Sequence, residues 1–188
     1  SNVQGACDMG ALPNNLPGYQ KVYNPMVRQK FAMEWGVSEL PAETGLTLTE
    51  IIDGACHRNV RGLYVMGENP VLSDPNQAHV IEGLEALDFL VVQDIFLTET
   101  AQYADVVLPS CSFAEKSGHF TNTERRVQRI NAAVNPPGNA KEDWVIIQML
   151  ANAMGGGWDY KTVADITNEI ARVTPQYGGL RWENITVN

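Results

Sequence analysis

The 188-residue sequence has few cysteines, and its three, Cys7, Cys56 and Cys111, lie far apart. No Cys-x-x-Cys pair is present, so the spacing predicts neither a disulfide framework nor a zinc or iron–sulfur site. The three histidines are equally scattered, and none has the spacing of a metal ligand. The sequence alone therefore assigns no metal ligand, and we expect reduced thiols in the cytoplasm.

Basic residues and long apolar runs are also scarce. Thirteen Lys and Arg stand against 22 Asp and Glu, which leaves a formal net charge of −9. Nucleic acids and anionic membranes are bound by basic surfaces, so we expect neither as a partner. Apolar runs such as Phe89–Val92 are far too short to cross a bilayer, and no basic start precedes an apolar core at the N-terminus.

The sequence does contain the pattern of an α/β core. Compact apolar runs at residues 62–66, 89–94 and 106–109 predict buried strands. Helices are expected between them, at about residues 75–87 and 98–104. Strands that alternate with helices predict a three-layer αβα fold with a doubly wound, mainly parallel, Rossmann-like sheet.

The chain is expected to divide by texture into three segments. Residues 1–60 begin with an irregular loop rich in Gly, Pro and Asn and continue as a helical lead-in that is part of the same domain. Residues 61–155 form the α/β domain. Residues 156–188 carry a helix and a tail that pack on this domain or lead into the next.

Four further helices are predicted outside the alternating strand–helix region. Asn24 can cap a helix that Pro25 opens and Gly36 ends, and a second helix should begin at Thr47 or Thr49. The other two are expected at residues 143–154 and at about 163–173.

Polar residues follow each predicted strand. The carboxyl ends of parallel strands meet at one edge of a sheet, and ligands bind there. The clusters are Gly67-Glu68-Asn69, then Gln93-Asp94 with Thr98 and Thr100, then the segment from Ser110 to Asn122. They predict a nucleotide-type binding site. They predict no reaction, because no nucleophile–base arrangement, carboxylate pair or metal cluster stands out.

Each polar cluster also has a purely structural interpretation. Gly67–Asn69 lacks a complete phosphate-loop motif and, taken alone, fits a plain tight turn better than a phosphate loop. Asp94 can accept hydrogen bonds from a ribose or a guanine, or it can cap a helix. Lys116 can balance a phosphate charge, or it can be an ordinary surface lysine.

Several motifs, in their order and spacing, resemble the molybdopterin oxidoreductase family. They are YVMGENP (64–70), VQDIFLTET (92–100), ADVVLP (104–109), EKSG (115–118) and FTNTERRVQ (120–128). Within that family, NVQGACDMG (2–10) and PGY (17–19) resemble the catalytic, or alpha, subunits of formate dehydrogenases.

The resemblance implies a much longer parent polypeptide. It would hold a 4Fe-4S cluster domain, two α/β domains that each grip one molybdopterin guanine dinucleotide, and a barrel-like domain. The Cys or selenocysteine that ligates molybdenum or tungsten would precede residue 1. The chain is therefore expected to be an excised fragment, inactive alone and without bound cofactor.

The resemblance also assigns roles to residues. The loop after the first strand would contact the nucleotide, the end of the second strand would recognise guanine, and the following helix start would lie beside the phosphates. Two charged residues further on would reach the same ligand. In that order they are Gly67, Glu68 and Asn69; Gln93 and Asp94; Thr98 and Thr100; Lys116 and Asp143.

For the parent enzyme, the resemblance implies oxidation of formate to CO2 on a bis-molybdopterin guanine dinucleotide cofactor, with electrons passing to the 4Fe-4S cluster. Implied partners are the remaining domains of the same subunit and electron-transfer subunits. Three alternatives stay open. They are another reductase of the family, such as a nitrate reductase; the cofactor-free relative in NADH–quinone oxidoreductase; and a Rossmann-like scaffold module without ligand.

Overall fold

The computed structural model describes residues 2–185 of the chain. They form two compact units that are interleaved in sequence. Of the described residues, unit 1 comprises 2–45, 117–131 and 159–185, and unit 2 comprises 46–116 and 132–158. The chain thus passes between the units four times. These boundaries differ from the segment boundaries near residues 60 and 155 that the sequence composition predicts.

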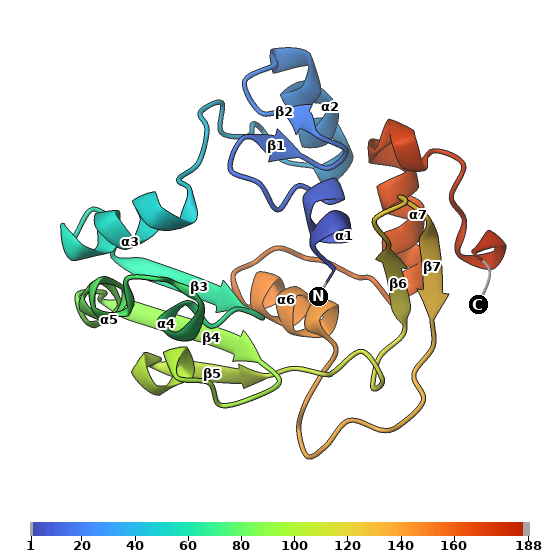
Figure 1. Cartoon of the computed structure of the whole chain (residues 1–188). Helices are drawn as coiled ribbons and strands as arrows, with labels where there is room; N and C mark the ends of the chain where they lie inside the picture. Colours follow the sequence, from blue (N-terminus) through green and yellow to red (C-terminus); the bar gives the residue numbers. More distant parts are fainter. Residues whose placement is uncertain (1, 186–188) are drawn as a thin grey trace. The chain divides into compact units, whose positions relative to one another are not determined.

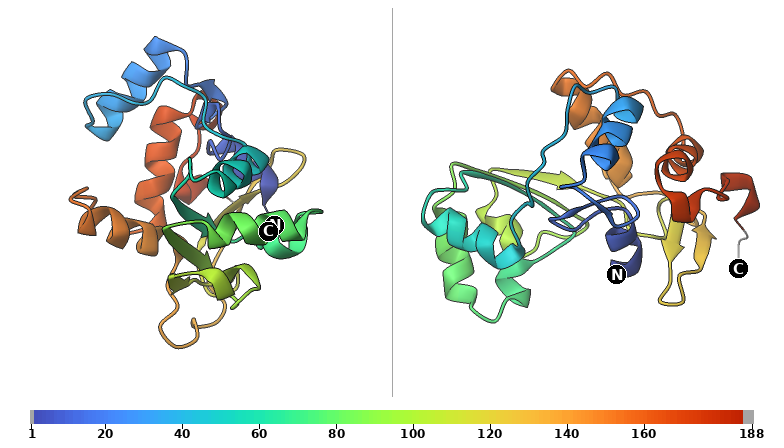
Figure 2. Two further views of the ribbon diagram at one scale, coloured as in Figure 1. Left: turned by 90° about the vertical axis from the view of Figure 1, so that its left-hand side faces the viewer. Right: turned by 90° about the horizontal axis from the view of Figure 1, so that it is seen from above.

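Unit 2 is built on a parallel three-stranded sheet in the order β3-β4-β5 (Figure 1). The strands are β3 (Gly62–Met66), β4 (Phe89–Asp94) and β5 (Val106–Pro109). Their positions and parallel pairing confirm the predicted α/β fold. Each strand in sequence order is added to the same side of the one before it, so the strand order does not reverse within the described residues. Figure 2 shows the sheet from two other directions.

The helices of unit 2 are mostly those expected, with two differences. They are α3 (Leu48–Cys56), α4 (Pro70–Ser73), α5 (Gln77–Glu85), the 3₁₀ helix η1 (Thr100–Tyr103) and α6 (Asp143–Ala153). The helix expected at about 75–87 is α5, which begins slightly later because the Asn76 side chain accepts from His79 N and caps it there. The short helix α4 before it was not expected. The helix expected at 98–104 is only the short η1.

The core of unit 2 lies on one face of the sheet. Val65, Leu90 and Val92 point to this face and pack with buried residues of α3, α4, α5 and η1. Tyr64 and Gln93 point to the other face, as the alternation of a strand requires. There Gln93 hydrogen-bonds Asp143 at the start of α6. Helices therefore meet both faces, as the three-layer prediction requires.

Unit 1 contains more regular structure than the sequence indicates. Its elements are α1 (Val3–Asp8), β1 (Asn15–Leu16), β2 (Gln20–Lys21), α2 (Pro25–Trp35), β6 (Gly118–Thr121), β7 (Val127–Ile130), α7 (Val163–Val173), η2 (Pro175–Tyr177) and η3 (Trp182–Asn184). The prediction of an irregular loop over residues 1–20 is wrong, since α1 and the β1–β2 hairpin lie there. The antiparallel hairpin β6–β7 was not predicted either.

The capped helices are the best-predicted elements. Asn24 Oδ1 accepts from Met26 N at 3.0 Å, and Gly36 ends α2 in the left-handed conformation, with φ 64°. Thr47 caps α3 through a capping box with Glu50. Helix α7 occupies residues 163–173 as expected, but it belongs to unit 1 and not to the unit that contains the parallel sheet.

A buried polar network ties three elements of unit 1 together. The Tyr177 hydroxyl donates to Asp8 Oδ2 at 2.6 Å and lies 3.1 Å from Thr121 Oγ1. All three side chains are buried, so these bonds are shielded from water. They link α1, β6 and η2.

The free energy of unfolding should fall as the pH rises from about 10 to about 12. Burial, reinforced by Asp8, raises the pKa of Tyr177 to about 12. Burial and a hydrogen bond to Glu169 likewise raise the pKa of Tyr160 to about 12. In the unfolded chain both phenols ionise near pH 10. The folded state therefore holds these protons more tightly, and its advantage is full below pH 10 and lost through pH 12.

Phenolate absorption in an alkaline titration measures this effect. Two of the six tyrosines should ionise about two pH units after an unperturbed tyrosine. Tyr177→Phe should remove one of the two late phenols. A single transition near pH 10 that includes all six would contradict the prediction.

Candidate functional site

The structure brings the predicted polar clusters together at the carboxyl edge of the sheet. Met66 pairs with Gln93, and Asp94 pairs with Pro109, so the three strands end at nearly the same level. The next backbone groups continue the pairing: Gly67 N donates to Gln93 O at 2.9 Å, and Ser110 N donates to Asp94 O at 3.0 Å. The loops after β3, β4 and β5 therefore begin side by side.

The loop after β3 depends on a glycine. Gly67 has φ +64°, a left-handed conformation that strains any residue with a Cβ, while no atom lies within 4 Å of where that Cβ would be. A ligand could therefore approach the backbone closely at Gly67, where no side chain stands in the way. The exposed Glu68 side chain accepts a 2.7 Å hydrogen bond from Ser73 Oγ, and its other oxygen has no partner among residues 2–185.

Asn69 joins the first loop to the second. Its Oδ1 accepts from Thr100 N at 3.2 Å and from Thr100 Oγ1 at 2.7 Å. Its Nδ2 donates to Glu99 Oε2 at 2.7 Å, and this bond lowers the pKa of Glu99. Thr100 is fully buried, so it supports the loops from beneath instead of facing a ligand. Glu99, which the sequence did not single out, faces solvent at this edge.

Asp94 has a structural role in the turn after β4, although it caps none of the described helices. Oδ1 accepts from Phe96 N at 3.1 Å, so the carboxylate turns the chain after β4. Oδ2 makes no hydrogen bond to any described residue, and the side chain is half-buried. Thr98 also has a structural role, since its Oγ1 accepts from Ala101 N at 3.2 Å at the start of η1.

A chain of polar side chains runs behind this edge. The Tyr64 hydroxyl donates to Gln93 Oε1, and Gln93 Nε2 donates to Asp143 Oδ1 at 2.8 Å. Asp143 Oδ2 in turn pairs with the Lys116 ammonium. Gln93 is completely enclosed. Burial, together with the charge of Asp143, raises the pKa of Tyr64, which therefore remains a neutral donor.

The Lys116–Asp143 ion pair changes the expected role of the lysine. Both side chains are half-buried, with 27% and 29% of their surface exposed. Asp143 neutralises the charge that a phosphate would otherwise meet. An ammonium group has three N–H donors, however, and only one is needed for Asp143. Tyr64 was not among the predicted site residues. Its place in β3, two residues before the strand end, puts its side chain on the same sheet face as that of Gln93 in β4.

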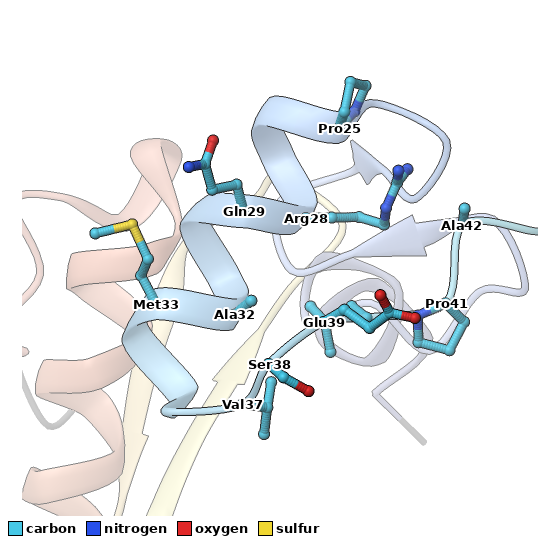
Figure 3. Close-up of a pocket in the computed structure, with 11 residues that line it drawn as sticks. Pro25, Arg28, Gln29, Ala32, Met33, Val37, Ser38, Glu39, Pro41 and Ala42 are labelled. Carbon is cyan, nitrogen blue, oxygen red and sulfur yellow. The ribbon is translucent and has the colours of Figure 1, made fainter.

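The two cavities described for unit 1 contain none of the nine predicted site residues. One, of about 520 Å³, lies between α2 and residues 37–42, and Pro25, Arg28 and Glu39 are among its lining residues (Figure 3). The other, of about 430 Å³, lies beside the buried tyrosine network and is lined in part by Asp8, Arg125 and Tyr177.

Comparison with known proteins identifies the family. Residues 1–153 match the family model described as molybdopterin oxidoreductase. This match covers most of the chain, so the chain belongs to the molybdopterin oxidoreductase family. Membership implies a molybdopterin cofactor, in agreement with the motifs at residues 64–70 and 92–100.

Two of the relatives that resemble the chain are named as formate dehydrogenases. The chain is 56% identical, over its whole length, to the alpha subunit of an F420-dependent formate dehydrogenase of Methanocaldococcus jannaschii, of which it covers 28%. It is 45% identical over 98% of its length to formate dehydrogenase H of Escherichia coli, of which it covers 26%. The chain thus spans little more than a quarter of the length of these relatives.

A solved structure supports the fold. The acetylene hydratase of Pelobacter acetylenicus superposes with a TM-score of 0.61 and 25% identity, over 84% of this chain and 23% of that one. No helix within residues 2–185 has both the length and the apolar character needed to span a membrane.

Proposed function

We propose that the chain is part of the catalytic subunit of a formate dehydrogenase and that unit 2 binds the guanine end of one molybdopterin guanine dinucleotide. Two observations support this. Formate dehydrogenases are the relatives named above, and the carboxyl edge of β3-β4-β5 presents an unpaired carboxylate oxygen beside an open glycine loop.

Asp94 is the observation that carries the proposal. A guanine base offers N1–H and an exocyclic amino group on one edge, and a carboxylate accepts from both. Asp94 Oδ2 has no partner among the described side chains, and Oδ1 has a second lone pair beside the one used by Phe96 N. The donor and acceptor chemistry therefore fits a guanine. Gly67 adds a place where the backbone can approach the ligand closely.

The remaining predicted residues are proposed to act at different distances from the ligand. Glu68 and Asn69 would meet the nucleotide directly, and Lys116 would donate to it with the N–H groups that Asp143 does not use. Gln93, Thr100 and Asp143 would position these groups, since Gln93 and Thr100 are fully buried. Thr98 would keep the start of η1 beside the phosphates.

When bound, the cofactor, a bis-molybdopterin guanine dinucleotide with molybdenum or tungsten, supplies the two-electron redox chemistry that the side chains lack. The residues of this chain orient it by fixing its nucleotide end. The remaining domains of the subunit would hold the metal ligand and a 4Fe-4S cluster that takes the electrons from formate. We place the assembly, with its electron-transfer subunits, in the cytoplasm.

Asp94→Asn should speed the loss of cofactor from the full-length gene product by about 10- to 100-fold, because an amide replaces a charge-assisted acceptor with a group that also donates. The measurement is the guanine nucleotide retained after dilution, determined by chromatography of the denatured protein. Asp88→Asn is the matched control, since Asp88 stands just before the opposite end of β4 and pairs with Arg58 and Arg61. Equal retention by both variants would refute the role of Asp94.

The reaction is tested separately with the same full-length protein. Formate should reduce an electron-accepting dye, and the 188-residue chain alone should give no rate. A protein that reduced nitrate and ignored formate would belong to the alternative reductase. A protein that contained no molybdenum, tungsten or guanine nucleotide would fit the scaffold alternative.

A further inference from the structure

Unit 2 carries a second group of chemically reactive side chains, on the helices α3 and α5. These helices pack against each other and against the sheet through the core of unit 2. Cys56 Sγ lies 3.6 Å from His79 Nδ1, and His79 Nδ1 lies 4.0 Å from Glu82 Oε2. One ligand atom from each residue lies within 4.8 Å of the other two. None of the three belongs to the proposed cofactor site.

From this geometry we infer that Cys56, His79 and Glu82 form a binding site for a divalent metal ion of the zinc type. A thiolate, an imidazole and a carboxylate form a ligand set suited to Zn²⁺. In a tetrahedral site with Zn–S of about 2.3 Å and Zn–N of about 2.0–2.1 Å, sulfur and nitrogen lie about 3.5 Å apart. The observed Sγ–Nδ1 distance already matches this value.

The histidine is held in the orientation that a metal ligand needs. His79 Nε2 lies 2.6 Å from Asp53 Oδ1. An ionised carboxylate only accepts, so Nε2 carries the hydrogen, and Nδ1 of the neutral ring offers its lone pair toward Cys56. A carboxylate behind a metal-binding histidine is the usual arrangement in zinc sites. Asp53 is therefore a positioning residue of this site.

The approach of the two helices depends on Gly83. A Cβ at this position would lie 3.2 Å from the Ile52 carbonyl oxygen and 3.4 Å from Cys56 Sγ. The missing side chain lets α5 come close to α3 at the level of the thiol. Glu82, the most exposed of the three proposed ligands, is 73% exposed and can move the short distance needed to complete the third position. Solvent would take the fourth.

Sequence spacing does not reveal the group, because α3 contributes one ligand and α5 contributes two that are only three residues apart. Cys56 and His79 are 23 residues apart. The Cys56 thiol donates to the His79 carbonyl oxygen at 3.6 Å. Burial, with the charges of Glu82 and Asp53, raises the pKa of Cys56.

Titration of the 188-residue chain with Co²⁺ tests the inference, because a cobalt–thiolate bond gives a near-ultraviolet charge-transfer band. The band should saturate at one Co²⁺ per chain, and Zn²⁺ should abolish it by displacement. Cys56→Ser should remove the band, while the matched variant Cys7→Ser should keep it in full. Asp53→Asn should weaken binding by about 10- to 100-fold.

Two further variants keep the test decisive if Cys56→Ser fails to fold. Glu82→Gln replaces an exposed side chain, so it should fold normally and bind Co²⁺ at least about 10-fold more weakly. Gly83→Val should separate the helices and reduce the band. Absence of the band in the wild-type chain, its survival in Cys56→Ser, or unchanged affinity in Glu82→Gln would overturn the inference.

Discussion

Asp143→Ala should lower the free energy of unfolding of unit 2 by about 1–3 kcal/mol, the cost of leaving buried polar partners unsatisfied. The substitution removes two interactions at once. Lys116 loses its counterion, and the enclosed amide of Gln93 loses its acceptor. The value lies below that of a fully buried ion pair because both charged side chains keep more than a quarter of their surface exposed.

Amide hydrogen exchange of β4 measures the effect within unit 2. Asp143→Asn should be milder, because an asparagine oxygen can still accept from Gln93. The control is Glu85→Gln, which changes an exposed carboxylate on α5 in the same unit and should alter stability by no more than about 0.5 kcal/mol. Equal effects at positions 143 and 85 would show that the hydrogen bonds and the ion pair of Asp143 contribute nothing to stability.

Leu90→Ala should be the most destabilising of the substitutions considered, at about 2–5 kcal/mol. Leu90 lies in the central strand and is only 1% exposed. Truncation to Ala loses the transfer free energy of the side chain and leaves a cavity among Val65, Leu84 and other residues of the core. Urea denaturation followed by circular dichroism gives the change, with the slope of the transition as a check that two-state analysis holds.

Leu97→Ala is the matched comparison for Leu90→Ala. Leu97 follows the same strand but is 73% exposed, so the same chemical change should alter stability by no more than about 0.5 kcal/mol. If both substitutions destabilised the protein equally, Leu97 would be covered by another part of the protein. If neither did, the assignment of Leu90 to the core would be wrong.

The parts of the fold that the sequence predicts well are those where local chemistry and packing agree. Asn24 and Gly36 delimit α2 through a cap and a left-handed residue, and both signals are local. The central strand β4 appears as an apolar run because residues on both of its faces, such as Val92 and Gln93, are buried. The hairpin β6–β7 was missed since its residues are mostly half-buried and its turn contains Arg125 with φ +62°, a conformation that no glycine announces.

The sequence predicted where the candidate site residues lie, but it did not predict which of them are exposed and which are buried. Strand ends located Asp94 and Gly67 correctly at one edge, because parallel strands require it. The sequence could not distinguish Glu68, which is exposed, from Gln93, which is fully enclosed. The burial of Gln93 depends on its contact with α6, which lies about 50 residues later in the sequence. For the same reason the partner of Lys116, 27 residues away, was not foreseen as an ion pair.

The interleaving of the two units has a consequence for synthesis on the ribosome. Unit 2 ends at residue 158, so all of it has been made before the last segment of unit 1. Unit 1 needs α7, which begins at Val163 and packs against α2. Because domains fold as units as the chain emerges, the parallel sheet should complete its folding while α1 and α2 still lack their partner. The nascent chain should thus leave Phe31 and Ala32, the buried residues of α2, without their full packing until residues 163–173 have emerged from the ribosome.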